Sequence, residues 1–101
     1  MKFTFKKHIP TGRYRSFETE NHDIKLAKQI VGYISEDSYR SNIKFEERFS
    51  VSFAIIDDTK NCGWKWIILK KRFGNAEDAR TFVNMNAEKI QEQLNLYKFP
   101  N

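Results

Sequence analysis

Residues 43–73 read IKFEERFSVSFAIIDDTKNCGWKWIILKKRF, and this stretch predicts the centre of the fold. Residues 43–56 alternate apolar and polar side chains, which is typical of a strand whose two faces meet different surroundings. Residues 57–63 are rich in turn formers, and residues 64–73 contain the tryptophans and β-branched residues that favour a second strand. We therefore expect a long β-hairpin, with a bend near Glu46 and Glu47, where the alternation fails.

The register of this hairpin decides what its two faces carry. Symmetric closure places Phe53 beside Ile67 and Val51 beside Leu69, on a face that is apolar and suited to a covering helix. A shift of one residue would exchange the faces of either arm, because neighbouring side chains in a strand point in opposite directions. The other face mixes tryptophans with cations and small residues: Trp64, Trp66, Ile68, Lys70 and Arg72 from one arm, with Arg48, Ser50, Ser52 and Ala54 from the other.

The segments before the hairpin predict further β-structure. Residues 1–7 alternate phenylalanine with polar residues, as a short strand does. We interpret residues 13–17 as a second short strand or an extended arm. Residues 23–26 and 29–35 predict two strands joined by a tight turn at Ala27-Lys28.

The pattern changes after Gly74, where apolar residues recur with the period of about 3.6 that is typical of a helix. Asn75 is suited to cap this helix, and the acids that follow it favour the positive end of the helix dipole. Asn86 is a candidate cap for a second, separate helix. Strands followed by a helix predict an α+β protein, with an antiparallel β-sheet of about four to five strands and a C-terminal helix packed on one face. We expect a single α+β domain comprising residues 1–101.

Composition indicates the compartment. No apolar run approaches the roughly 20 residues of a membrane span, and Met1-Lys2-Phe3 does not begin a secretory signal. Cys62 is the only cysteine, so an internal disulfide is excluded, which fits a reducing compartment. We expect a cytoplasmic protein that does not bind membranes.

Catalytic and cofactor motifs are missing from the sequence. His8 and His22 are isolated, and Cys62 has no base near it in the chain. Asp57 and Asp58 stand side by side in the predicted turn, but they lack the further oxygen ligands that a metal ion needs. No glycine-rich phosphate loop is present. We therefore expect a protein that is not an enzyme and that holds no cofactor and no metal.

Charge is unevenly distributed along the chain. The net charge is +5, and ten of the 18 Lys and Arg residues lie in residues 1–16 and 60–72, which contain no acid. The rest of the chain holds eight cations against 13 acids. Such asymmetry concerns partners rather than the fold.

Nucleic-acid binders combine cations for phosphate with flat side chains for bases, and the mixed hairpin face offers both. In an alternative interpretation, Trp64 and Trp66 pack beneath the N-terminal strand while the cations are solvated. The candidate residues for binding nucleic acid or another partner are Trp64, Trp66, Lys70, Arg72, Arg48, Arg13 and Arg15.

Residues 63–66 (GWKW) and 71–80 (KRFGNAEDAR) resemble the last strand and the start of the helix in three-stranded-sheet DNA-binding domains, such as the arm-binding domains of phage integrases. The resemblance implies that an exposed sheet face meets DNA through Trp66, Lys70 and Arg72. In size and style the whole chain is similar to small phage or prophage accessory proteins, including anti-CRISPR proteins. This second resemblance implies inhibition by binding, without catalysis.

Three functions follow as expectations. The first is a small, basic, non-enzymatic binding module that acts on nucleic acid or a nucleoprotein complex through its aromatic and basic sheet face. The second is a phage-type inhibitor of a host defence or regulatory complex, which binds a host protein. The third is a homodimer that buries the same tryptophans.

Overall fold

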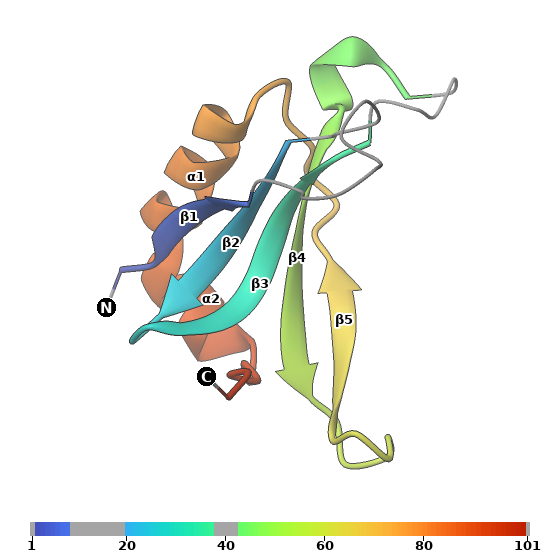
Figure 1. Cartoon of the computed structure of the whole chain (residues 1–101), viewed down its shortest axis with the longest axis vertical. Helices are drawn as coiled ribbons and strands as arrows, with labels where there is room; N and C mark the ends of the chain where they lie inside the picture. Colours follow the sequence, from blue (N-terminus) through green and yellow to red (C-terminus); the bar gives the residue numbers. More distant parts are fainter. Residues whose placement is uncertain (1, 9–19, 38–42, 101) are drawn as a thin grey trace.

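A computed structural model of the chain describes residues 2–8, 20–37 and 43–100. In these ranges the strands form one five-stranded antiparallel sheet in sequence order, and the two helices follow them. The helices lie on one side of the sheet, behind it in Figure 1, and β5 forms the right-hand edge. The expected α+β class is confirmed. The elements are β1 (Thr4–His8), β2 (Asn21–Leu26), β3 (Gln29–Glu36), the 3-10 turn η2 (Phe45–Glu47), β4 (Phe49–Ile56), β5 (Trp64–Ile68), α1 (Ala76–Met85) and α2 (Ala87–Gln93).

The register of the β4–β5 hairpin is the predicted one. Phe53 lies opposite Ile67, and the Leu69 N–H donates to the Val51 carbonyl at 2.9 Å. The tryptophans therefore lie on the face turned away from the helices, because they alternate with the residues that face the core. We refer to this side of the sheet as the outer face.

Both arms of the hairpin are shorter than predicted. Residues 45–47 form η2 instead of strand, and β4 begins only at Phe49. The turn is held by a backbone bond of 2.9 Å from Glu47 N–H to the Lys44 carbonyl. Phe45 is consequently 72% exposed, although the alternation placed it in the core. The second arm ends as a strand at Ile68, and beyond it only an isolated bridge joins Phe73 to Phe49.

The core lies between the sheet and the helices. Phe53 is fully buried at its centre, and its ring centroid is 5.7 Å from that of Phe3. Gly32 lies opposite Phe53 on β3. A Cβ there would clash with the Ser52 carbonyl oxygen and lie 3.0 Å from the Phe53 ring, so space selects glycine at this position. The buried core residues are Phe3, Ile24, Leu26, Val31, Ile34, Phe49, Val51, Phe53, Phe73, Ala76, Ala79, Val83, Ala87 and Ile90.

The β2–β3 turn lies where it was predicted, at Ala27 and Lys28. Both residues have positive φ angles, 52° and 69°. Two-residue hairpin turns of this kind favour asparagine and glycine, because other residues are strained in the left-handed region. The position of this turn therefore follows from the pairing of β2 with β3, and not from the residue types of the turn itself.

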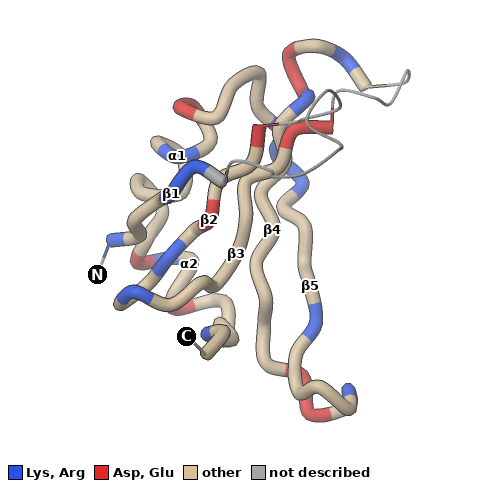
Figure 2. Tube along the Cα trace, viewed as in Figure 1, with Lys and Arg blue, Asp and Glu red and all other residues tan. Residues whose placement is uncertain are grey.

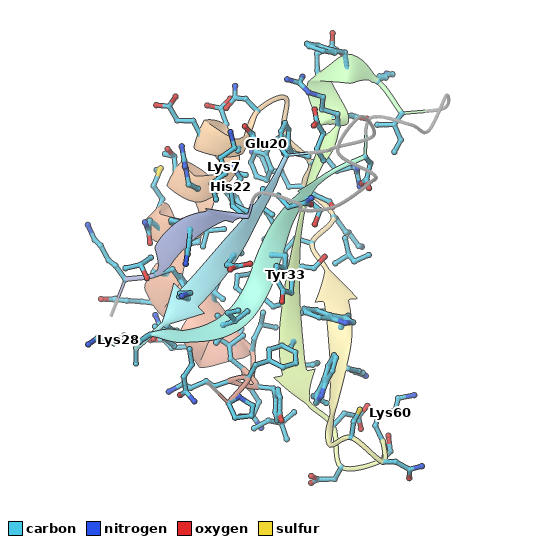
Figure 3. All side chains as sticks on the ribbon, viewed as in Figure 1. Lys7, Glu20, His22, Lys28, Tyr33 and Lys60 are labelled. Carbon is cyan, nitrogen blue, oxygen red and sulfur yellow. The ribbon has the colours of Figure 1, made fainter. Side chains whose placement is uncertain are left out.

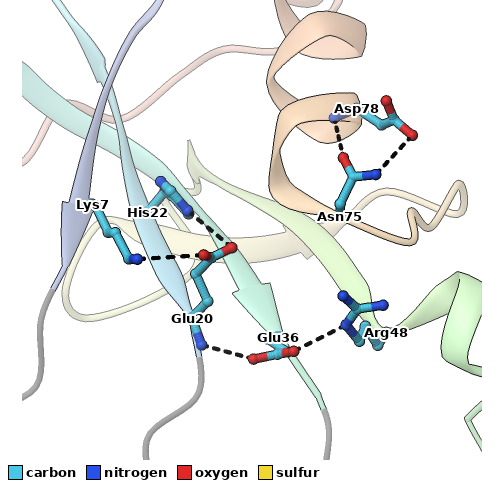
Figure 4. Close-up of polar contacts among 7 residues, drawn as sticks. All are labelled: Lys7, Glu20, His22, Glu36, Arg48, Asn75 and Asp78. Carbon is cyan, nitrogen blue, oxygen red and sulfur yellow. Dashed lines mark hydrogen bonds and ion pairs between the residues drawn. The ribbon is translucent and has the colours of Figure 1, made fainter.

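Two asparagines define the limits of α1. Asn75 Oδ1 accepts the Asp78 N–H at 2.7 Å, which confirms the predicted N-cap (Figure 4). The division into two helices at Asn86 is also confirmed. Its side chain, however, donates to the Phe82 carbonyl at 2.8 Å and makes no capping bond to α2. Asn86 therefore closes the first helix and does not cap the second through its side chain.

The residues that follow α2, 94–100, run back along the sheet. The Ile56 N–H donates to the Asn95 carbonyl at 2.8 Å, and the Tyr97 N–H donates to the Ala54 carbonyl at 2.9 Å. A third bond of 2.9 Å runs from the Phe99 N–H to the Ile30 carbonyl of β3. This C-terminal tail therefore bonds to the end of β4 and to β3. It brings two aromatic side chains to the outer face.

Candidate interaction site

Five aromatic rings gather on the outer face, and we name them the aromatic cluster. Trp64 and Trp66 come from β5 and pack edge to face, with ring centroids 5.2 Å apart. The tail stacks Tyr97 on Trp64 at 5.8 Å and places Phe99 4.8 Å from Trp64 and 5.7 Å from Trp66. Tyr33 of β3 completes the cluster, with its ring 5.5 Å from that of Trp66. Such contacts stabilise each pair by about 0.5–1.5 kcal/mol beyond burial of area.

The neighbours of the tryptophans differ from those expected. They are residues of β3 and of the tail, whereas the N-terminal strand β1 lies at the opposite edge of the sheet. The sequence of the tail gives no local signal for the face of the sheet that it reaches. Tyr33 lies near the middle of the outer face (Figure 3), and burial, with a smaller effect of the Asp23 carboxylate, raises its pKa above 10.0.

Arg72 is a structural residue. Its Nη2 lies 2.6 Å from Asp37 Oδ2, and its Nε donates to the Glu47 carbonyl at 2.6 Å. These bonds tie the segment after β5 to the segments after β3 and around η2. A phosphate group would have to compete with a carboxylate for this guanidinium, whose charge-assisted hydrogen bonds are among the strong ones.

Arg48 is engaged in the same way. Its Nε donates to Glu36 Oε2 at 3.0 Å, its Nη1 donates to the Phe45 carbonyl at 3.1 Å, and its guanidinium lies 3.9 Å from the centre of the Phe45 ring. Glu36 also accepts the Glu20 N–H at 2.9 Å (Figure 4). Arg48 thus belongs to a polar network that closes this end of the sheet.

Glu20 extends this network towards β1. Its carboxylate lies 3.5 Å from Lys7 Nζ and 3.4 Å from His22 Nε2 (Figure 4). The His22 ring is buried, and neither of its nitrogens forms a well-aligned hydrogen bond with a described residue. Lys7 and Arg48, the cations of this network, are matched by acids.

Lys70 differs from the two arginines. It is exposed and forms no ion pair with any residue in the described ranges. Lys65 lies 3.6 Å from Asp57, and Lys71 Nζ lies 5.4 Å from the centre of the Phe82 ring. Figure 2 shows Lys and Arg along β5 and the chain that follows it, with red acidic positions in the turn below.

Two apolar side chains of β5 remain open to solvent beside Lys70. Trp66 is 42% exposed and Ile68 is 65% exposed. Trp64 is only partly exposed, because the tail covers it. We name Trp64, Trp66, Ile68 and Lys70 the β5 surface. The structure therefore brings Trp64 and Trp66 together, leaves Lys70 exposed just beyond β5, and engages Arg48 and Arg72 in ion pairs, while Arg13 and Arg15 lie outside the described residues.

Among the described residues, no group of three or more His, Cys, Asp or Glu side chains is placed to hold a metal ion. Cys62 is exposed in the hairpin turn, and its Sγ lies 3.2 Å from the Trp64 carbonyl oxygen. None of the helices in the described ranges has the length and hydropathy needed to span a bilayer.

Comparisons with protein-family models, with curated proteins and with solved structures give no match. The function is therefore inferred from the fold and from the chemistry of the β5 surface.

Proposed function

We propose that the protein is a non-enzymatic binding module that docks a partner protein on the β5 surface. The observation that carries the proposal is the exposure of Trp66 and Ile68 on the rim of an aromatic cluster. Aromatic side chains at the centre of an interface supply much of the binding free energy. Neighbouring exposed apolar side chains on a sheet face are also typical of protein interaction sites.

The ion pairs of Arg48 and Arg72 favour a protein partner over free nucleic acid. Phosphate binding depends on cations that are free to replace the counterions of the nucleic acid. Arg48 and Arg72 are held by Glu36 and Asp37, so these expected contacts are already used within the chain. Lys70 is the predicted cation that is exposed and without an ion pair to a described residue.

A nucleoprotein complex is the second candidate partner. Lys70 follows directly after the exposed part of β5, so one phosphate could be contacted while Trp66 and Ile68 meet a protein surface. In both cases the module acts by occupying a surface of its partner. This mode of action is the one expected of the predicted inhibitor of a defence or regulatory complex.

A pull-down from a lysate of the cells that contain the protein tests the proposal. The bait is the full chain, with Trp66→Ala as the test variant and Lys25→Ala as the control. We expect the wild type and Lys25→Ala to retain the same protein partner, and Trp66→Ala to lose it. Retention should survive nuclease and about 1 M NaCl, at which the electrostatic screening length is about 3 Å.

Direct titration of the purified protein with single- and double-stranded oligonucleotides separates the two candidates. A protein-directed module should bind them weakly or not at all. If a free nucleic acid were the ligand, Lys70→Ala would lower the slope of log affinity against log salt by about one unit, and Lys25→Ala would not. Loss of the captured partner after nuclease treatment, together with such a slope, would contradict the proposed protein partner.

A further inference from the structure

β5 has a neighbouring strand on one side only in the described part of the chain, because it is the last strand of the sheet order. On its other side the Trp64 carbonyl accepts a bond of 3.2 Å from the Cys62 thiol. The N–H of Leu69 donates to Val51, and the N–H of Asp57 donates to Gly63, each at 2.9 Å. Bonded pairs recur every two residues in an antiparallel ladder. Lys65 and Ile67 therefore face β4 with their backbone groups, and the residues between them face outward.

Trp64, Trp66 and Ile68 consequently direct both N–H and C=O groups away from the sheet, in its plane. Natural edge strands are commonly protected by proline, by a bulge or by charged side chains, especially lysine. β5 contains no proline, its pairing with β4 is regular from Trp64 to Ile68, and its single charged residue, Lys65, is paired with Asp57. Two of the three outward-facing residues also expose apolar side chains on the outer face. The edge thus has the features of a strand that accepts another strand.

Charge determines which strand fits. Residues 60–72 contain five cations and no acid. Lys65 is paired with Asp57, and Arg72 is paired with Asp37. The cations without an ion pair to a described residue are Lys60 before the strand and Lys70 and Lys71 after it. Lys60 lies at the tip of the β4–β5 hairpin (Figure 3), where Asp57 and Asp58 also lie, so this end of β5 is mixed in charge and only the Lys70 end is cationic. The centre, around Trp66, is apolar.

We propose that the free edge of β5 binds an extended segment of a partner protein as an added strand, and that this segment is apolar at its centre and acidic at the end that meets Lys70 and Lys71. The inference rests on the proposed function and gives it a partner chemistry. Main-chain hydrogen bonds to Trp64, Trp66 and Ile68 hold the added strand, and alternate side chains give specificity. Five residues of β5 span about 17 Å at about 3.4 Å per residue, which sets the length of the bound segment.

A second copy of this chain fits the edge poorly. Antiparallel pairing of two β5 strands about Trp66 would place Lys70 of one copy opposite Cys62 of the other, which offers no acid. Parallel pairing would bring each lysine to its own counterpart. Like charges directly opposite are destabilising in a sheet, and neither orientation places an acid opposite Lys70. An acidic residue of a guest strand opposite Lys70 supplies that charge.

Selection from a displayed library of random decapeptides on the full-length protein tests the inference. We expect the enriched peptides to carry acids at the end that meets Lys70 and Lys71, and apolar residues at alternate central positions. The test variant is Ile68→Pro, which removes one outward N–H and leaves the bonds to β4 intact, since proline is tolerated where the N–H faces solvent. Ile68→Ala is the matched control, because it loses the same side chain and keeps the N–H.

The affinity of an enriched peptide should fall about tenfold or more from Ile68→Ala to Ile68→Pro, because a carbonyl of the guest loses its donor. Amide hydrogen exchange on the wild type gives a second readout, which does not depend on the variant folding. On peptide binding, exchange at Trp64, Trp66 and Ile68 should slow about tenfold or more, while Lys65 and Ile67 are already protected.

Several results would overturn the inference. Equal affinity of the two variants, without slower exchange at the three amides, would show that side chains alone bind the peptide; the proposed function would then still stand. A basic or uncharged consensus would contradict the charge pattern, and no enrichment at all would contradict an open edge. A wild-type dimer at micromolar concentration in sedimentation would assign the edge to a second copy. The proposed function itself fails if Trp66→Ala retains the partner in the pull-down, or if nuclease removes the partner and Lys70→Ala lowers the salt slope for oligonucleotides.

Discussion

Replacement of Phe53 by alanine tests the packing of the helices on the sheet. Phe53 is fully buried, opposite Ile67 on β5 and next to Gly32 on β3. Truncation would remove a ring that lies 5.7 Å from the Phe3 ring, and the hydrogen of Gly32 offers no side chain to refill the space. The cavity term therefore applies nearly in full. We expect a loss of about 3–5 kcal/mol in the free energy of unfolding.

Urea unfolding followed by circular dichroism would measure this loss, and thermal unfolding would report it as a fall of at least about 12 °C for a domain of this size. The chain supplies a matched control in Phe45, which is 72% exposed and lies over Arg48. Phe45→Ala removes the same atoms from the surface and should cost at most about 1 kcal/mol. Similar losses for the two variants, or less than about 1 kcal/mol for Phe53→Ala, would refute the placement of the core.

Three further predictions concern single side chains. Gly32→Ala should destabilise the protein by about 1–3 kcal/mol in urea unfolding, because the new methyl group meets the carbonyl of the neighbouring strand. Gly74→Ala is the control: its methyl group meets only contacts of 3.4 Å or more, so the free energy of unfolding should change little. Thr59→Val should raise the pKa of Asp57 towards 3.8 in a carboxyl NMR titration, since the Thr59 hydroxyl bond is the first cause that lowers it. A lowered carboxyl pKa stabilises the fold above about pH 4, and this stabilisation is lost as the pH falls, so the stability of the variant should lose the part of this acid dependence that the hydroxyl bond supplies. Phe99→Ala should shift tryptophan emission to longer wavelength and cost about 1–2 kcal/mol, because two indoles lose a ring neighbour; unchanged emission would contradict the tail's place in the aromatic cluster.

The residue types of the candidate site were predictable from the sequence, but the ion pairs of its arginines were not. Trp66 is exposed on the outer face, and Lys70, two residues beyond the end of β5, is exposed as well. Arg72 occupies the expected segment, yet its partner Asp37 is 35 residues away in the chain. No local pattern reports a pairing over such a distance, because the ion pair exists only once β3 and the end of β5 are brought together. The pairing of Arg48 with Glu36 was not predictable for the same reason.

The sequence by itself determined the class of fold, the hairpin register and the start of the first helix. These follow from interactions between residues that are near in the chain: the two-residue alternation of β4, the turn formers between β4 and β5, and the cap at Asn75. Local patterning indicated a break in the strand near Glu46 and Glu47, but it placed Phe45 in the core, whereas residues 45–47 form a 3-10 turn that exposes Phe45. Only the tertiary structure decided that the C-terminal tail crosses to the outer face and covers Trp64, and that β5 is left as an edge. Both depend on contacts between distant segments, whose free energy is realised only when the whole sheet has assembled.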